Sequence, residues 1–305
     1  MKHAISIEGL TKTFNGATAV NSLRFEVKKG ELFGLVGPDG AGKTTTIRML
    51  TGIMTPTAGN AWVAGHSIVT EPEPLKKKIG YMSQRFGLYE DLTVMENIHF
   101  YADLYEVPRR DRPARIERLL GFSNLTPFKD RLAGKLSGGM KQKLGLACSL
   151  IHTPEVLFLD EPTNGVDPVS RRDFWKILYE LLKEGITILV STAYLDEAER
   201  CARIGLMHRG SILMLEEPAV IKRSLPGGMI EAWSEDSRRA AEIAKAIEGV
   251  KSVNVYGNKL HIAVADRSMM DAVKEKLQAA GVSLRGAREI SPSLEDVFIA
   301  KVENR

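Results

Sequence analysis

Cysteine is scarce in this chain of 305 residues, which contains only Cys148 and Cys201. The two cysteines lie far apart, and each sits in an apolar stretch with helix-like spacing. A disulfide scaffold or a cysteine-rich metal site needs more cysteines at closer spacing. We therefore expect two buried free thiols in a protein of a reducing compartment.

Long hydrophobic runs are missing as well. The apolar runs at residues 156–159 and 186–190 are far too short to span a bilayer, because a membrane-crossing helix takes about 20 apolar residues. The N-terminal stretch MKHAISIEG lacks an apolar core of signal-peptide length. The sequence therefore predicts a cytoplasmic protein, or one that a partner holds at a membrane.

Neither sign of charge dominates the chain. It carries 42 Lys and Arg residues against 38 Asp and Glu, for a net charge of +4 at pH 7, and the two signs are interspersed. We expect no nucleic-acid partner, because no basic arm marks one. The apolar share of 44% is ordinary for a soluble globular protein, and the length suits about two domains.

The sequence does contain a glycine-rich loop, GPDGAGKTT, between the apolar run 32–36 and a helix-like stretch. Strand, loop and helix in this order form a phosphate cradle, because glycines turn the backbone N–H groups inward and the helix start adds its positive dipole end. We expect Lys43 to reach the β- and γ-phosphates, Thr44 to bind Mg²⁺ and Thr45 to bond the α-phosphate. The residues predicted here to bind a nucleoside triphosphate are Gly37, Pro38, Asp39, Gly40, Ala41, Gly42, Lys43, Thr44 and Thr45.

Two carboxylates follow a second apolar run. Residues 156–159 read as a strand buried on both faces of a parallel sheet, and Asp160 and Glu161 come directly after it. Open α/β sheets bind ligands at the carboxyl ends of their strands. Asp160 suits the Mg²⁺ shell, and Glu161 suits a base that orients the attacking water. Such a pair alone is most often a solvated turn; beside a phosphate loop it predicts catalysis.

The opening of the chain predicts antiparallel strands, since apolar and polar residues alternate up to Gly9 and again at residues 23–27. Phe14 falls in the turn region between them. An aromatic there is ordinarily turn packing, but a ring some two dozen residues ahead of a phosphate loop can also stack on an adenine.

Residues 88–153 have mostly helical spacing and predict a helical insertion. Near its end, Ser137 can cap a helix whose first residues are Gly138 and Gly139. This helix start is a second site suited to an anion.

A linker around residues 224–228 divides the chain into predicted domains at 1–224 and 225–305. The second part reads as β-α-β-β-α-β, the order of a small ferredoxin-like α+β domain. It has no catalytic constellation, so its default role is regulatory or a dimer contact. The stretch SPSLEDVFIAKV looks like a capped amphipathic helix.

Taken together, the phosphate loop, Gln84, LSGGMKQ, VLFLDEP and residues 164–167 closely resemble the ATP-binding subunit of ABC transporters, over about residues 3 to 222. The most specific motif is LSGGMKQ, because other phosphate-loop proteins lack it. The resemblance implies a P-loop α/β fold with a mixed sheet core, an antiparallel β subdomain and a helical subdomain at about 88–153. It also implies two such domains that face each other head to tail.

The resemblance assigns roles to individual residues. Phe14 would stack on adenine, Glu161 would be the general base, and Lys43 and Gln84 would complete the catalytic group. The Mg²⁺ group would be Thr44, Gln84 and Asp160. The signature residues Ser137, Gly138, Gly139 and Gln142 would act on the partner domain's ATP, and Asp167 would lie at the dimer seam. The segment after Gln84, with residues 88–101, would receive the coupling helix of a permease, which would hold the chain on the inner face of the cell membrane.

The C-terminal domain followed by SLEDVF resembles subunits that serve antibiotic and multidrug efflux permeases, which favours export over import. One position departs from the family, since Ala193 stands where the switch histidine is expected. Removing one such donor costs on the order of 10² to 10³ in rate. Three hypotheses remain: an exporter ATPase working as a homodimer or heterodimer, a soluble ATP-gated clamp, and a catalytically weak regulatory subunit.

Overall fold

The computed structural model describes residues 3–84 and 87–303 and divides into two compact units, Met1–Leu215 and Glu216–Arg305. The helix α8 (Pro218–Arg223) therefore belongs to the second unit, whereas the sequence placed the boundary one helix later, at 224/225. The reason is packing, because α8 contacts the helix α11 (Leu294–Glu303). Among the described residues, no helix is both long and apolar enough to cross a membrane.

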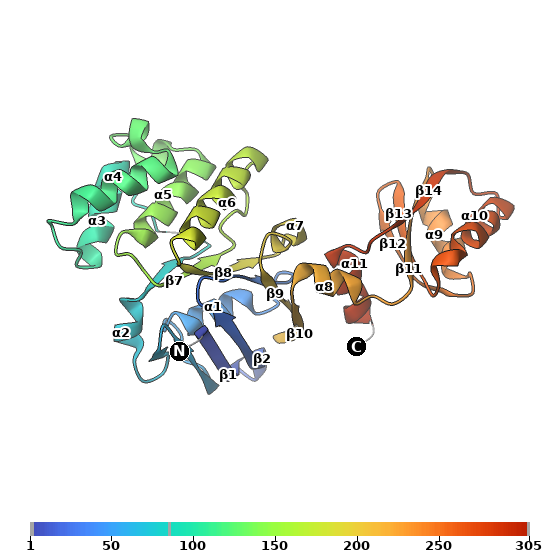
Figure 1. Cartoon of the computed structure of the whole chain (residues 1–305), viewed down its shortest axis with the longest axis horizontal. Coiled ribbons are helices and arrows are strands. Elements are labelled where there is room, and N and C mark those ends of the chain that lie inside the picture. Colours follow the sequence, from blue (N-terminus) through green and yellow to red (C-terminus); the bar gives the residue numbers. More distant parts are fainter. Residues whose placement is uncertain (1–2, 85–86, 304–305) are drawn as a thin grey trace. The chain divides into compact units, whose positions relative to one another are not determined.

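The first unit is built on a six-stranded sheet with the order β10-β9-β3-β8-β7-β6 (Figure 1). Its strands are β3 (Leu32–Val36), β6 (Ile79–Met82), β7 (Val156–Asp160), β8 (Thr187–Thr192), β9 (Arg203–His208) and β10 (Ser211–Glu216). The pairs β6-β7, β7-β8, β8-β3 and β3-β9 are parallel. Every residue of β3, β7 and β8 is buried, as the continuous apolar runs predict.

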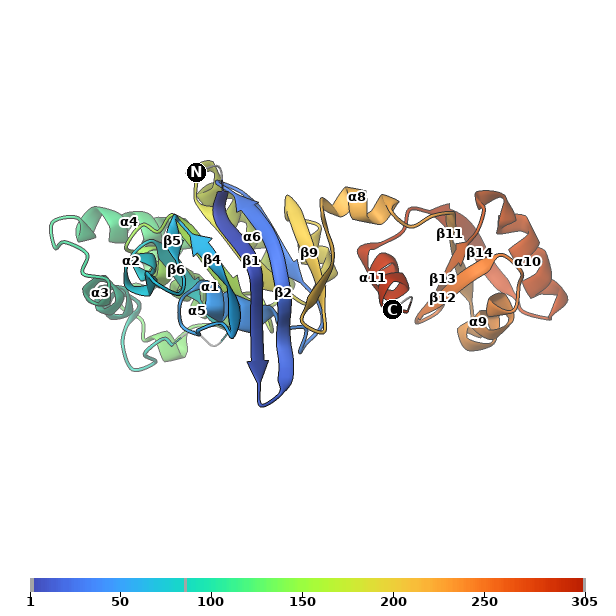
Figure 2. The same ribbon diagram turned by 90° about the horizontal axis from the view of Figure 1, so that it is seen from below.

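A second, antiparallel sheet contains the opening of the chain, with the order β2-β1-β4-β5. Its strands are β1 (His3–Phe14), β2 (Ala17–Lys28), β4 (Ala58–Val63) and β5 (His66–Ser67). Figure 2 shows β1 and β2 as one long hairpin. The expectation that Phe14 lies in the turn is wrong, because Phe14 is the last residue of β1 and pairs with Ala17. Asn15 and Gly16 make the turn, both with positive φ, as a tight hairpin requires.

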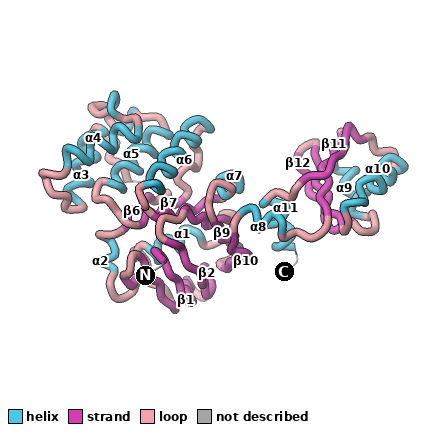
Figure 3. The backbone as a smooth tube through the Cα atoms, viewed as in Figure 1, coloured by secondary structure: helices cyan, strands magenta, loops and turns pink. Residues whose placement is uncertain are grey.

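Helices cover the six-stranded sheet, and α3, α4 and α6 pack around α5 (Figure 3). The helices of this unit are α1 (Lys43–Leu50), α2 (Pro72–Lys76), α3 (Val94–Leu104), α4 (Arg112–Ser123), α5 (Gly138–Leu150), α6 (Pro168–Lys183) and α7 (Leu195–Ala198), with short 3₁₀ turns at Thr126–Phe128 and Ala133–Lys135. The predicted helical insertion contains α3, α4 and α5. Cys148 and Cys201 are buried and free, as expected, and burial raises the pKa of both thiols.

The second unit contains a four-stranded antiparallel sheet with the order β12-β13-β11-β14. Its elements are β11 (Gly228–Ser234), α9 (Ser237–Lys245), β12 (Val250–Tyr256), β13 (Lys259–Val264), a 3₁₀ turn at Arg267–Met269, α10 (Met270–Ala279) and β14 (Leu284–Ile290), besides α8 and α11. This is the predicted β-α-β-β-α-β order. Helices α9 and α10 cover one face over an apolar core, and α11 lies at the other face (Figures 1 and 3).

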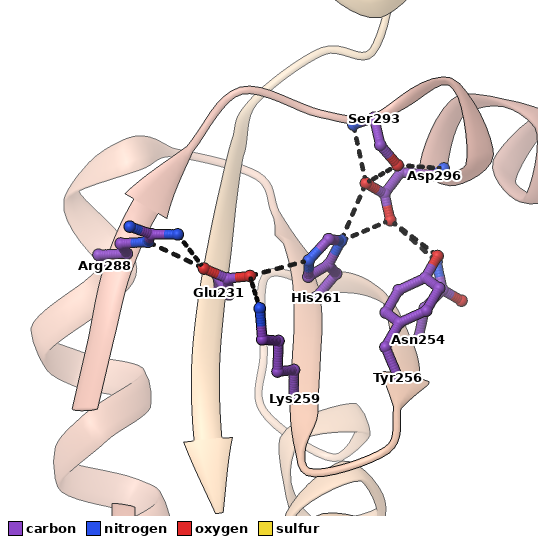
Figure 4. Close-up of polar contacts among 8 residues, drawn as sticks. All are labelled: Glu231, Asn254, Tyr256, Lys259, His261, Arg288, Ser293 and Asp296. Atoms are coloured by element: carbon purple, nitrogen blue, oxygen red, sulfur yellow. Dashed lines mark hydrogen bonds and ion pairs between the residues drawn. The ribbon is translucent and has the colours of Figure 1, made fainter. Parts of the chain in front are cut away.

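A polar row crosses the face of this sheet that looks away from α9 and α10. Strand register aligns one residue from each strand, namely Asn254, His261, Glu231 and Arg288. Buried Glu231 accepts from Arg288 Nε at 2.8 Å and from Lys259 Nζ at 3.4 Å (Figure 4). Burial alone would raise the pKa of Glu231, but the hydrogen bonds and charges of Arg288 and Lys259 outweigh it and lower that pKa.

The other end of the row fixes the start of α11. Buried Asp296 lies 3.0 Å from His261 Nδ1 and accepts from the backbone N–H and the hydroxyl of Ser293, while Ser293 Oγ accepts from the Asp296 N–H (Figure 4). Ser293 and Asp296 thus form a reciprocal cap, as the sequence predicts for this helix. Asp296 thereby joins the helix to the sheet.

We predict that Glu231→Gln lowers the thermal midpoint of unfolding most above pH 5. Because the folded-state pKa of Glu231 is lowered, its stabilisation is present above the unfolded pKa of about 4.3 and disappears as the pH falls through the folded pKa. Circular dichroism melts between pH 7 and pH 3.5 measure this difference. Glu242→Gln, at an exposed position of α9, is the control. An equal effect of both variants at every pH would contradict the prediction.

Candidate functional site

The glycine-rich loop connects β3 to α1 and depends on two close backbone approaches. A Cβ added to Gly37 would lie 2.2 Å from the carbonyl oxygen of Met207, and one added to Gly42 would lie 2.5 Å from that of Ala19. Gly42 also has a φ of 104°, which disfavours any other residue. The loop is therefore tight enough to aim its backbone N–H groups at one point.

The side chain of Lys43 folds back onto the carbonyl groups of this loop. Its ammonium group donates to the carbonyls of Gly37 at 2.7 Å and Pro38 at 3.1 Å, and it lies 3.1 Å from Glu161 Oε1. The side chain is only 4% exposed. A buried ammonium needs such partners, and its charge is available to an anion that enters the loop.

Asp160 is the last residue of β7, and the two oxygens of its carboxylate differ in their hydrogen bonds. Its Oδ1 accepts from Thr44 Oγ1 at 3.1 Å and from Ser191 Oγ at 2.6 Å. Its Oδ2 is buried and has no hydrogen-bond partner among the residues that the structure describes. A lone buried carboxylate oxygen beside a threonine hydroxyl fits a hard divalent cation such as Mg²⁺, which prefers oxygen ligands.

Glu161 follows in a left-handed backbone conformation, with a φ of 49°. Its N–H is held by the carbonyl and the hydroxyl of Ser191, at 3.2 and 3.0 Å. Gln84 Nε2 donates to Glu161 Oε2 at 3.0 Å. The left-handed conformation of Glu161 costs on the order of 1–3 kcal/mol. It persists only where surrounding contacts enforce it, which is typical of functional sites.

Lys43, Gln84 and Glu161 line one cavity of about 420 Å³, whereas Asp160 lies beneath it and reaches it through Thr44. Its lining residues are Ala19, Asp39, Gly40, Ala41, Gly42, Lys43, Thr44, Thr45, Gln84 and Glu161. Phe14 is not among them, but its ring is 43% exposed at the end of β1, with Lys12 Nζ 5.2 Å from its centroid. Sequence reasoning missed Ser191, which touches both carboxylate residues; its only local signal is a hydroxyl near the end of a buried strand.

The other predicted residues begin helices and do not line this cavity. Ser137 caps α5 by accepting from the Met140 N–H at 3.3 Å, and both Ser137 and Gly138 are exposed. Asp167 caps α6 and accepts from the N–H groups of residues 169 and 170, which holds the pKa of its carboxyl below the usual value. Gly139 packs against Ser170, and Gln142 lies on α5.

The fold and this cavity define a P-loop ATPase cassette of the ABC type, followed by an α+β domain. Residues 20–164 match the ABC transporter family model, and residues 217–302 match the C-terminal domain of DrrA1-3-like ATP-binding proteins. The chain belongs to the ATP-binding proteins of ABC transporters. Its cassette is thus a nucleotide-binding one.

Several relatives and several solved structures are similar to the chain. The probable multidrug ABC transporter ATP-binding protein YbhF of Escherichia coli is 44% identical over 97% of this chain and 51% of its own length, so the chain spans about half of that relative. The daunorubicin/doxorubicin resistance ATP-binding protein DrrA of Streptomyces peucetius is 34% identical over 97% and 92%. A dimeric ATP-binding cassette in a post-hydrolysis state bound to ADP and Pi matches with a TM-score of 0.64 and 25% identity, over 70% of this chain and 98% of its own.

We predict that Gly37→Ala weakens binding of a fluorescent ATP analogue by about five- to 150-fold. The added methyl collides with the Met207 carbonyl, and overpacking costs about 1–3 kcal/mol, where 1.4 kcal/mol is tenfold in affinity. The control is Gly121→Ala in α4, where an added Cβ meets open space. Equal affinity of the Gly37 variant and the unchanged chain, measured by titration, would contradict the prediction.

Proposed function

We propose that the chain binds MgATP and hydrolyses it to drive a separate membrane permease that exports drugs or other amphiphilic compounds. The observation that carries this proposal is that Glu161 pairs with Lys43 and Asp160 accepts from Thr44 at the end of the glycine loop, while Asp160 Oδ2 has no partner within the described residues. Export is supported by the names of the relatives, which include drug-resistance and Nod factor export proteins. The proposed location is the inner face of the cell membrane, through the permease.

In this proposal, each residue of the site has a role that follows from its position. The loop N–H groups and Lys43 bind the phosphates, and Thr45 assists at the α-phosphate. Thr44, Asp160 and Gln84 hold Mg²⁺, which when bound neutralises phosphate charge. Glu161 orients the attacking water and accepts its proton, and Phe14 stacks on the adenine.

A second ABC cassette completes the site in this proposal. The exposed start of α5 at Ser137 and Gly138 does not line the cavity of its own chain, so it is free to meet the ATP of a partner. The backbone N–H groups of a helix start suit a γ-phosphate. Asp167 would lie at the seam. The partner is a second copy, or a different cassette that has a switch histidine.

The permease contact is proposed at the predicted segment 88–101, which follows residues 85–86 outside the described part of the chain. Two exposed rings lie there, those of Tyr89 and Phe100, with centroids 4.5 Å apart, and the half-buried ring of Tyr101 lies 5.5 Å from that of Phe100. Exposed aromatic clusters are typical of interface centres.

We predict slow steady-state ATP hydrolysis by the purified chain, abolished in Glu161→Gln. Ala193→His should raise this rate, by up to about 10² to 10³, since the histidine adds a donor at the γ-phosphate. No rise would overturn the idea that Ala193 limits catalysis. Tight ATP binding without turnover above the Glu161→Gln blank would favour a histidine-bearing partner or a regulatory subunit instead.

We also predict that the chain sediments with membranes when a neighbouring permease is co-expressed, and that Phe100→Asp loses this property. A charge in an aromatic contact is costly to desolvate. Tyr179→Asp on α6 is the matched control, because Phe100 and Tyr179 are both 36% exposed. If the chain stays in solution even with the permease present, the soluble clamp is favoured. Sedimentation without any permease would contradict the prediction.

A further inference from the structure

The carboxylate of Glu161 is held at both oxygens. Its Oε1 faces Lys43 Nζ at 3.1 Å, and its Oε2 accepts from Gln84 Nε2 at 3.0 Å and from Asn164 Nδ2 at 3.4 Å. The side-chain amide of Asn164, in the loop after β7, thus contacts a residue that lines the cavity. Two amide donors on one oxygen restrict the rotation of the carboxylate.

The amide of Asn164 is itself oriented by a residue of the next loop. The hydroxyl of Tyr194 donates to Asn164 Oδ1 at 3.3 Å. With its oxygen engaged by a donor, the amide turns its NH₂ group toward Glu161. Tyr194 directly follows Ala193, whose methyl group offers no hydrogen bond.

Tyr194 is fixed from two sides. Its N–H donates to Thr192 Oγ1 at 2.9 Å, and the guanidinium of Arg171 lies 4.5 Å from the centroid of its ring. Such a cation–π contact holds a ring in place without using its hydroxyl. The hydroxyl therefore remains available to Asn164.

Glu197, three residues after Tyr194, carries a buried carboxylate and is 1% exposed. It pairs with Arg171 Nε at 3.5 Å and accepts from Thr192 Oγ1 at 2.8 Å and from the hydroxyl of Thr163. Thr163 belongs to the loop after β7, and Thr192 ends β8. Glu197 therefore ties together the two loops that carry Asn164 and Tyr194.

We propose that Asn164 and Tyr194 are positioning residues for Glu161, through which the loop after β8 reaches the catalytic carboxylate although residue 193 is alanine. The inference rests on the proposed hydrolysis, because it concerns the same site. Asn164 acts through the carboxylate of Glu161, and Tyr194 acts through Asn164. Their effect is to keep Glu161 Oε2 occupied and the carboxylate aimed, so their loss lowers kcat and leaves the KM for ATP unchanged.

The first test is the steady-state ATPase rate of Tyr194→Phe, which removes one hydroxyl and keeps the ring on Arg171. A hydrogen bond of this kind corresponds to a loss of about two- to tenfold in kcat. Tyr179→Phe is the matched control, since Tyr179 is equally exposed and its hydroxyl donates to the Arg200 carbonyl. In the Asn164→Ala background, Tyr194→Phe should have no further effect, because both act along one path. Equal rates for Tyr194→Phe and Tyr179→Phe, or additive losses with Asn164→Ala, would overturn the proposal.

The second test does not use activity. In nucleotide-free protein, the side-chain amide signals of Asn164, assigned by their absence in Asn164→Ala, should shift in Tyr194→Phe and stay in place in Tyr179→Phe. Unshifted signals would overturn the contact itself. If they shift while the unchanged chain does not exceed the Glu161→Gln blank, the proposed hydrolysis fails and the pair is only a structural brace, which overturns its positioning role. A shift together with a selective loss of kcat supports it.

Discussion

The burial of two charges, those of Lys43 and Asp160, next to the half-buried Glu161 governs the structure of the cassette. Lys43, Asp160 and Glu161 sit where β3 and β7 end, and buried charges are tolerated only with partners in place. The register of β7 against β8 places Ser191 beside Asp160, and Ser191 secures both carboxylate residues. The loop, the strand ends and the sheet register therefore depend on one another.

Features that arise from neighbours along the chain could be predicted from the sequence. The strand, loop and helix around residues 32–50 and the caps of α5 and α11 depend on local turn and capping chemistry. The contact of Ser191 with Asp160 could not, because it depends on the pairing of strands about thirty positions apart. The left-handed backbone of Glu161 also carries no sequence signal, since glutamate does not favour it.

In the second unit, too, local features could be predicted from the sequence and long-range contacts could not. Alternating residues and turns predict β-α-β-β-α-β, but only the register of four strands brings Asn254, His261, Glu231 and Arg288 into one row. The domain boundary differs for the same reason. The turn residues around Pro226 and Gly227 are a clear linker signal, yet α8 precedes them and packs on α11, so long-range packing overrides it.

Under the proposed arrangement, each chain carries parts of two different sites. The cavity of this chain lacks a histidine at position 193, whereas the start of α5 is exposed and has its full Ser-Gly-Gly sequence. A deficit at Ala193 would therefore weaken the cavity of this chain without affecting what Ser137 gives to a partner. Two copies would have two weakened sites, and a mixed pair would have one. The positioning of Glu161 through Asn164 and Tyr194 matters most at a weakened site, because fewer donors there fix the reacting groups.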